Sequence, residues 1–210
     1  MTSTVEVVWM RKISECLVCK EMYYNDQTEI YFWNPIIAAV RDGEFLQQAI
    51  DSDVTSIFLL TGSLLDVDKT VTLCRERQKF IFIHTDLIEG LGNDFGGIKY
   101  IAERVKPDGL ISTRNNVIKS AKELGIYTIQ RYFCVDSLAI HTGIKTIEQT
   151  NPDAVEILPG VIPRAVKQIG SCVRKPILTG GMVVSKEDVL ASLNSGAVGV
   201  STSCLKLWNE

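Results

Sequence analysis

The sequence predicts a parallel (β/α)₈ barrel: eight strands, seven full helices and a short C-terminal helix. From about residue 34 onward one unit recurs, an apolar β-branched run followed by a polar turn and an amphipathic segment. Eight such runs fit a closed barrel better than an open sheet. A doubly wound sheet that binds a dinucleotide is disfavoured, because no G-x-G-x-x-G opens a helix and Gly62 follows the second run, not the first.

The elements follow one another in strict alternation. We expect strands at residues 36–40, 56–60, 80–84, 109–112, 127–131, 154–158, 176–179 and 198–202. We expect helices between them at residues 44–52, 67–77, 97–105, 117–124, 137–150, 164–173 and 186–195, with the short C-terminal helix at 204–208. Alternating strands and helices of this length are typical of a parallel sheet.

Residues at the predicted helix ends support these boundaries. Gly125 and Gly196 follow the last apolar position of their helices, where a glycine commonly ends a helix. Ser185 with Asp188 three residues later resembles a helix N-cap. Prolines stand just ahead of three strands, at positions 107, 152 and 176.

The first 33 residues do not share the repeat. They mix aromatic and charged side chains without a clear period, so we divide the chain into an N-terminal extension (1–33) and a barrel domain (34–210). Three interpretations of the extension stay open: a helix or hairpin that covers the bottom of the barrel, an arm that binds a partner, or a poorly ordered segment.

Composition narrows the class of protein. The chain has a net charge of −3 and 46% hydrophobic residues, which is ordinary for a globular protein and argues against a basic coat for nucleic acid. No apolar window is long enough for a membrane span, and the start lacks the pattern of a signal peptide, so we expect a cytoplasmic protein with reduced cysteines. Cys16 and Cys19 have the spacing of half a zinc site, but the other half is missing, and we predict no metal site.

Three arginines follow predicted strands and would therefore meet at the C-terminal face of the barrel: Arg41, Arg114 and Arg131. A guanidinium suits a carboxylate or a phosphate, and several together favour an anionic ligand. The alternative is that each arginine pairs with a nearby carboxylate such as Asp42 or Asp136.

The last two predicted strands end in residues suited to phosphate. Gly180 and Gly181 follow the seventh strand, and Ser201, Thr202 and Ser203 end the eighth. Phosphate in such barrels is often held by these two loops, where glycines allow close approach to backbone N–H groups. The alternative is that the double glycine only makes a tight turn.

No catalytic constellation stands out among the remaining strand-end residues. His84, Asp86 and Glu156 could orient ligand hydroxyl groups or hold one cation. Lys79 and Lys175 lie at strand starts, the wrong end for a Schiff-base aldolase. The loop 85–96 contains three glycines that could let it close over a ligand. This inventory suits binding a small phosphorylated polyol better than transforming one.

Six segments in register resemble the glycerol uptake operon antiterminator regulatory proteins, the glycerol-3-phosphate-responsive antiterminators. They are HTDLIEGL, DGLISTRNNVI, IYTIQRYF, VEILPGVIP, ILTGGMV and VSTSCLKLW, and the resemblance spans roughly residues 34 to 208. It implies a barrel-like fold without an established catalytic role and without a cofactor. It also implies a regulator of glycerol-utilisation genes that senses glycerol 3-phosphate as effector, binds leader mRNA and permits transcription through a terminator.

The strand-end residues that match the family are Arg41, His84, Asp86, Thr113, Arg114, Arg131, Glu156, Gly180, Gly181, Thr202 and Ser203. On chemical grounds we assign the glycines and Ser201, Thr202 and Ser203 to the phosphate, the arginines to its remaining charge, and Asp86 with Glu156 to the glycerol hydroxyls.

The RNA-binding surface has no motif of its own, and other functions stay open. Candidate phosphate contacts are Arg75, Arg77 and Lys79; Lys119 and Lys122; or Arg164, Lys167, Arg174 and Lys175. Such clusters are more often solvated helix faces. One alternative function is a barrel enzyme that acts on a small phosphorylated polyol or a phosphodiester, and another is a metabolite sensor that acts through a protein partner. Self-association into a homo-oligomer is compatible with the sequence, and no contact with a membrane is expected.

Overall fold

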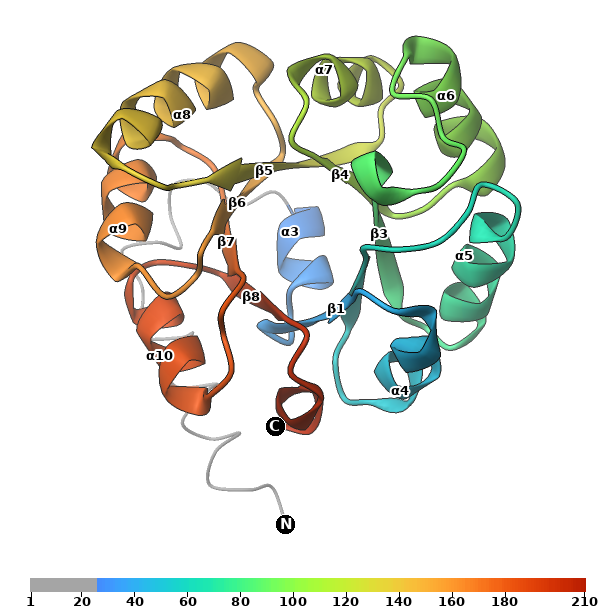
Figure 1. Cartoon of the computed structure of the whole chain (residues 1–210), viewed down its shortest axis with the longest axis horizontal. Helices are drawn as coiled ribbons and strands as arrows, with labels where there is room; N and C mark the ends of the chain where they lie inside the picture. The colour runs from blue at the N-terminus through green and yellow to red at the C-terminus, as the bar shows by residue number, and fades with distance from the viewer. Residues whose placement is uncertain (1–25) are drawn as a thin grey trace.

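The computed structural model describes residues 26–210, which form one closed barrel of eight parallel strands in the order of the chain (Figure 1). The strands are β1 (Ile36–Val40), β2 (Ser56–Leu59), β3 (Phe80–His84), β4 (Gly109–Ser112), β5 (Tyr127–Phe133), β6 (Ala154–Leu158), β7 (Ile177–Gly180) and β8 (Gly199–Thr202). β1 pairs with β8 and closes the barrel. The predicted fold class is therefore confirmed.

Seven helices surround the strands, and α3 lies across the centre of the ring in the view of Figure 1. The α-helices are α3 (Asp26–Tyr31), α4 (Leu46–Asp51), α5 (Val67–Glu76), α6 (Phe95–Tyr100), α7 (Asn115–Glu123), α8 (Ser137–Thr150), α9 (Pro163–Cys172) and α10 (Lys186–Asn194). Shorter turns are the 3₁₀ segments η1 (Gly43–Phe45), η2 (Thr85–Leu87) and η4 (Leu205–Asn209) and the π-helix η3 (Ile101–Val105). No helix within residues 26–210 is long and apolar enough to cross a membrane.

The helix-end predictions are confirmed in detail. Gly125 and Gly196 have φ angles of 73° and 103°, which glycine adopts without steric cost. At the start of α10 the Ser185 hydroxyl accepts a hydrogen bond from the Asp188 N–H at 3.2 Å, and the Asp188 carboxylate accepts one from the Ser185 N–H at 3.1 Å. This reciprocal pair is a capping box.

The barrel interior is filled by one residue in two along each strand. Its middle is an apolar cluster that includes Ile37, Phe58, Phe82, Ile129 and Leu178. The alternate side chains point outward and pack against the helices in two further clusters. Since these side chains fill the middle of the barrel, a ligand can bind only at one of its two ends.

Helix α3 closes the end where the strands begin. The ring of Tyr31 makes edge contacts with Phe80 and Tyr127 at centroid distances of 4.9 and 5.1 Å, and Thr28 shares a hydrogen bond of 2.7 Å with the Tyr127 hydroxyl. For residues 26–31, the structure matches one of the three interpretations of the N-terminal extension, a helix that covers the bottom of the barrel. Residues 1–25, including Cys16 and Cys19, lie outside the described part, and the domain division after residue 33 stays a prediction.

The described cysteines carry no disulfide. Cys74 and Cys134 are buried, as expected of small core residues, whereas Cys204 is half-buried and Cys172 is exposed. Within residues 26–210 no group of three or more metal-ligating side chains comes together.

Candidate functional site

A charged pair lies inside the barrel at the C-terminal ends of β5 and β6. The Arg131 Nε donates to Glu156 Oε2 at 2.6 Å, and the Ser201 hydroxyl of β8 donates to Glu156 Oε1 at 2.6 Å. Side-chain exposure is 7% for Arg131 and 0% for Glu156. Burying either charge alone would be costly, so each stabilises the other in the folded state. We call the opening lined by Arg131, Glu156, Ser201, Gly180 and His84 the barrel mouth.

Gly180 makes room for this arrangement. It pairs with Ser201 in the β7–β8 register and faces the same interior space. A Cβ atom built on Gly180 would lie 2.7 Å from Glu156 Oε1 and still closer to the Ser201 hydroxyl. The first glycine of the pair is therefore required by the buried side chains around it, whatever ligand the mouth holds.

Asp86 organises the opposite side of the mouth. Its carboxylate accepts hydrogen bonds from the Ser112 hydroxyl at 2.8 Å, the Thr113 N–H at 2.9 Å and the Thr113 hydroxyl at 2.8 Å. Burial by itself would raise the pKa of Asp86, but these hydrogen bonds outweigh it and hold the pKa below its ordinary value. Asp86 is therefore a carboxylate at neutral pH. Ser112 was not among the predicted site residues, because it precedes the polar turn and reads as part of the strand.

His84 is a neutral imidazole in this setting. Burial, followed by the positive charge of Arg131, lowers its pKa to about 4, and Asp86 opposes this only in part. Its Nδ1 lies 4.0 Å from Asp86 Oδ2 and has no hydrogen-bond partner among the described residues. An unsatisfied buried nitrogen beside an opening is a group that a bound hydroxyl or water can satisfy.

The arginine pairing differs from the alternative drawn from the sequence. Arg131 pairs with Glu156, and the exposed Arg114 places its Nε 3.5 Å from Asp86 Oδ1. Asp42 and Asp136 pair with neither arginine. They cap helices instead: each accepts from a backbone N–H, that of Glu44 at 3.0 Å and that of Ala139 at 2.7 Å. Asp42 and Asp136, the carboxylates named from the sequence as partners of the arginines, therefore do not take that role. Each is engaged by the backbone at the start of a helix.

Arg41 is a cation of the mouth rim without a partner among residues 26–210. It follows β1, is exposed, and forms no ion pair or side-chain hydrogen bond with residues 26–210. Its charge is available to an anion, unlike that of Arg131 or Arg114.

The loops after β7 and β8 offer backbone donors. Gly181 has a φ of 75° and Met182 a φ of 63°, so the chain turns sharply here. No hydrogen bond among residues 26–210 uses the N–H of Gly181 or of Ser203. Ser203 is exposed, whereas the Thr202 hydroxyl is buried and donates to the Val183 carbonyl at 2.7 Å. Thr202 can therefore offer a ligand only its backbone.

Hydrogen bonds fix the position of the loop 85–96 and the direction of the Gln130 side chain. The loop 85–96 is tied to the β2–α5 loop, because Glu89 N–H donates to Gly62 O and Leu64 N–H to Glu89 O, both at 2.9 Å. In this conformation it is a fixed wall of the site. Gln130, in the middle of β5, points away from the mouth and donates to Asn115 Oδ1 at 2.8 Å, as the alternation of side chains along a strand requires.

Comparisons with known proteins agree on one family. The sequence model of the family described as glycerol-3-phosphate responsive antiterminator matches residues 36–208. An uncharacterised protein of Escherichia coli (strain K12), YgcP, is 38% identical over 175 residues, which cover 83% of this chain and 92% of that protein.

Two solved structures are similar throughout the barrel. The glycerol uptake operon antiterminator regulatory protein of Listeria monocytogenes str. 4b F2365 has a TM-score of 0.80 and 33% identity, covering 83% of this chain and 95% of its own. A glycerol uptake operon antiterminator-related protein of Thermotoga maritima MSB8 has a TM-score of 0.74 and 29% identity, covering 82% and 96%. An aldolase called QR15 has a TM-score of 0.65, covers 84% of this chain and 92% of its own, and at 11% identity shares only the fold.

Proposed function

The chain belongs to the glycerol-3-phosphate responsive antiterminator family, and from this premise we propose that it is a regulator whose barrel mouth binds glycerol 3-phosphate. The bound effector promotes binding to the leader mRNA of glycerol-utilisation genes and so controls their expression. The protein acts in the cytoplasm, where both the metabolite and the nascent transcript are found. It needs no cofactor for this, and catalysis is not part of the proposal.

The observation that carries the proposal is the set of unused donors on one side of the mouth. The N–H groups of Gly181 and Ser203 and the guanidinium of Arg41 have no partner among residues 26–210. Backbone N–H groups with a nearby arginine are the usual means of holding a phosphate. The Ser201 hydroxyl is already used by Glu156, so the phosphate is bound by the backbone and by Ser203 more than by Ser201 and Thr202 side chains.

The glycerol part of the effector fits the deeper groups. The unsatisfied Nδ1 of His84 and the remaining acceptor capacity of Asp86 and Glu156 suit hydroxyl groups that both donate and accept. Arg131 and Arg114 are neutralised by these carboxylates and hold them in place. Their charge is thus used mainly within the protein, and Arg41 takes the role of compensating the phosphate.

Calorimetric titration with glycerol 3-phosphate tests the phosphate site. We expect binding by the wild type and at least a tenfold loss, about 1.4 kcal/mol, in Gly181→Val. At Gly181 a side chain is strained by the φ of 75° and would lie 3.3 Å from Leu158 Cδ2 beside the proposed phosphate.

Gly196→Val is the matched control. Gly196 also has a positive φ, of 103°, and precedes β8 at the far end of the barrel, where an added Cβ meets nothing within 4 Å. It should bind the effector like the wild type. Unchanged affinity in Gly181→Val, or binding of glycerol as tight as that of glycerol 3-phosphate, would contradict the assignment.

A further inference from the structure

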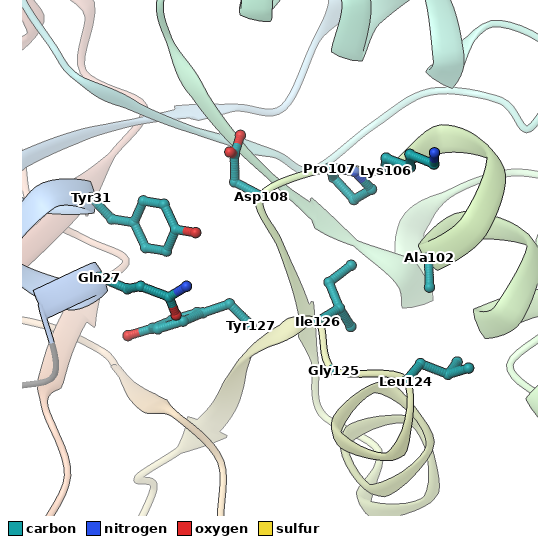
Figure 2. Close-up of a pocket in the computed structure, with 10 residues that line it drawn as sticks. All are labelled: Gln27, Tyr31, Ala102, Lys106, Pro107, Asp108, Leu124, Gly125, Ile126 and Tyr127. Atoms are coloured by element: carbon teal, nitrogen blue, oxygen red, sulfur yellow. The ribbon is translucent and has the colours of Figure 1, made fainter.

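A cavity lies at the opposite end of the barrel from the mouth. It has a volume of about 320 Å³ and opens between helix α3 and the segments that lead into β4 and β5. This volume is at the lower end of the range of small-molecule pockets. We call it the lower cavity and define it by Gln27, Tyr31, Lys106, Asp108 and Tyr127, which are among its lining residues (Figure 2).

Polar groups that have no partner within the described part of the chain converge on the lower cavity. Figure 2 shows Gln27 and Tyr31 pointing from α3 toward the segment that contains Lys106 and Asp108. The Gln27 amide, the Tyr31 hydroxyl and the Lys106 ammonium form no hydrogen bond with residues 26–210. Asp108 uses Oδ2 to accept from the Ile81 N–H at 2.8 Å, and its Oδ1 accepts from no other described residue.

The carboxyl and the phenol are both partly removed from water. Burial raises the pKa of Asp108, and burial together with the charge of Asp108 raises the pKa of Tyr31. The Asp108 carboxyl and the Tyr31 hydroxyl are therefore best stabilised by hydrogen bonds from a ligand. Such a ligand would carry N–H donors and acceptors along one edge.

Positive charge borders this cavity. The Arg75 Nη2 donates to the Lys106 carbonyl at 2.7 Å, so the guanidinium is held at the backbone of Lys106. Arg75 also acts electrostatically on Asp108. Lys106 itself is exposed and has a φ of 54°, a left-handed conformation that ends the preceding π-helix. Two cations therefore lie at the edge of a cavity whose wall is aromatic and whose base is polar.

We propose that the lower cavity receives an unpaired nucleobase of the RNA. The ring of Tyr31 supplies a surface for stacking, Gln27 and Asp108 read the hydrogen-bonding edge of the base, and Lys106 with Arg75 contacts the adjoining phosphates. Sequence-specific recognition of RNA uses this combination: unstacked bases on aromatic rings, hydrogen bonds to the base edge, and basic side chains on the backbone. The inference rests on the proposed RNA-binding function and adds to it the site of contact.

The assignment also separates the two ligands in space. Effector and RNA then occupy opposite ends of one barrel. Of the basic clusters named from the sequence, the one that includes Arg75 is linked to the lower cavity by the hydrogen bond from Arg75 to the Lys106 carbonyl. In the same cluster Arg77 pairs with Asp51 at 3.2 Å, and Lys79 donates to the carbonyls of Ser52 and Val54. These two side chains are engaged away from the cavity, whereas Arg75 is bonded to the segment that lines it.

The test is RNA binding by the full chain in the presence of glycerol 3-phosphate. The probe is a fluorescent RNA selected for binding to the wild type from a random 20-nucleotide library. The variants are Gln27→Ala, Tyr31→Phe and Lys106→Asn, which remove single polar groups and keep the aromatic packing. Asn at position 106 also tolerates the left-handed conformation. Lys145→Asn, on the exposed face of α8, is the control for charge.

We expect Gln27→Ala and Lys106→Asn to weaken RNA binding by about five- to tenfold. Tyr31→Phe, which keeps the stacking ring, and the control Lys145→Asn should bind RNA nearly like the wild type. Calorimetry with glycerol 3-phosphate should give wild-type affinity for all four variants, which shows that they are folded. If the cavity variants keep both affinities, the lower cavity is not the RNA site, and a site for another partner becomes the better explanation, while the proposed function stands. If the selection yields no RNA that the wild type binds, the proposed function falls and this inference falls with it.

Discussion

His84 is held in its neutral form by its surroundings. In the folded protein burial and Arg131 lower its pKa from 6.5 to about 4. In the unfolded chain it returns to its ordinary value, so between pH 6.5 and about 4 the unfolded state binds more protons than the folded state. The free energy of unfolding must therefore fall as the pH is lowered through this range. Asp86, whose pKa is lowered from 3.8, loses its stabilising contribution only at still lower pH.

The lowered pKa of His84 should dominate the dependence of stability on pH between pH 6.5 and about 4. A pKa shift of this size corresponds to roughly 3 kcal/mol. Urea unfolding measured across the range should show a steep loss of stability in the wild type and a shallower loss in His84→Asn. His141→Asn, which replaces the other histidine at an exposed position, is the control variant for this measurement. Identical pH profiles for the wild type and His84→Asn would contradict the assignment of a neutral buried imidazole.

Contacts between single residues of the mouth could not be predicted from the sequence. Arg131 and Glu156 were both identified as strand-end residues, but the sequence does not say that they face each other. Their pairing follows from the β5–β6 register, in which Arg131 lies opposite Glu156. Ser201 reaches the same carboxylate only because β7, which lies between their strands, has a glycine at that level. Such contacts depend on distances between strands that a linear pattern does not contain.

At the scale of elements, periodicity predicted nearly every strand and helix. The differences have local causes. β5 continues to Phe133, two residues beyond the prediction, because Tyr132 and Phe133 still pair with Ile157 and Leu158 of β6. The helix expected at 97–105 begins at Phe95, because Asp94 caps it, and its second half is the π-helix η3. Helix α3 was not predicted as such, since six residues are too few for a helical period to be recognised.

The buried pair between β5 and β6 leads to a prediction about how these elements are held together. Replacing Glu156 by Gln leaves the Arg131 charge buried without compensation, and breaking such a pair typically costs about 3–5 kcal/mol. We expect Glu156→Gln to lower the free energy of unfolding by this amount in urea denaturation. The double variant Arg131→Met, Glu156→Leu should be more stable than Glu156→Gln, because no charge then remains buried.

The exposed pair of Arg77 and Asp51 provides the control for that experiment. Its side chains are 54% and 56% exposed, and exposed pairs contribute less than about 1 kcal/mol. Asp51→Asn should therefore change stability little. If Glu156→Gln lowers the free energy of unfolding no more than Asp51→Asn does, the buried pair does not stabilise the barrel.

At the scale of the whole molecule, a single strand connects the two proposed sites. Tyr127, at the wall of the lower cavity, and Arg131, in the barrel mouth, are both on the inner side of β5. They are four positions apart along the strand, a distance of about 13 Å. Between them lies Ile129, packed in the same interior cluster as Phe82, which in turn contacts Tyr31 at a ring distance of 5.2 Å. A closely packed core of this kind transmits small displacements from one end to the other.

This arrangement predicts that the effector and the RNA affect each other's affinity. Glycerol 3-phosphate bound in the proposed site should order the groups around Arg131 and raise RNA affinity. Linkage then requires RNA to raise the affinity for glycerol 3-phosphate by the same factor. A coupling of about 1–3 kcal/mol corresponds to a factor of about 5–150. The two factors can be measured separately, by RNA titration with and without effector and by calorimetry with and without RNA. The RNA affinity should also fall steeply with salt concentration, because phosphate contacts release counterions. RNA affinity that does not change when glycerol 3-phosphate is added would show that the two ends of the barrel are independent.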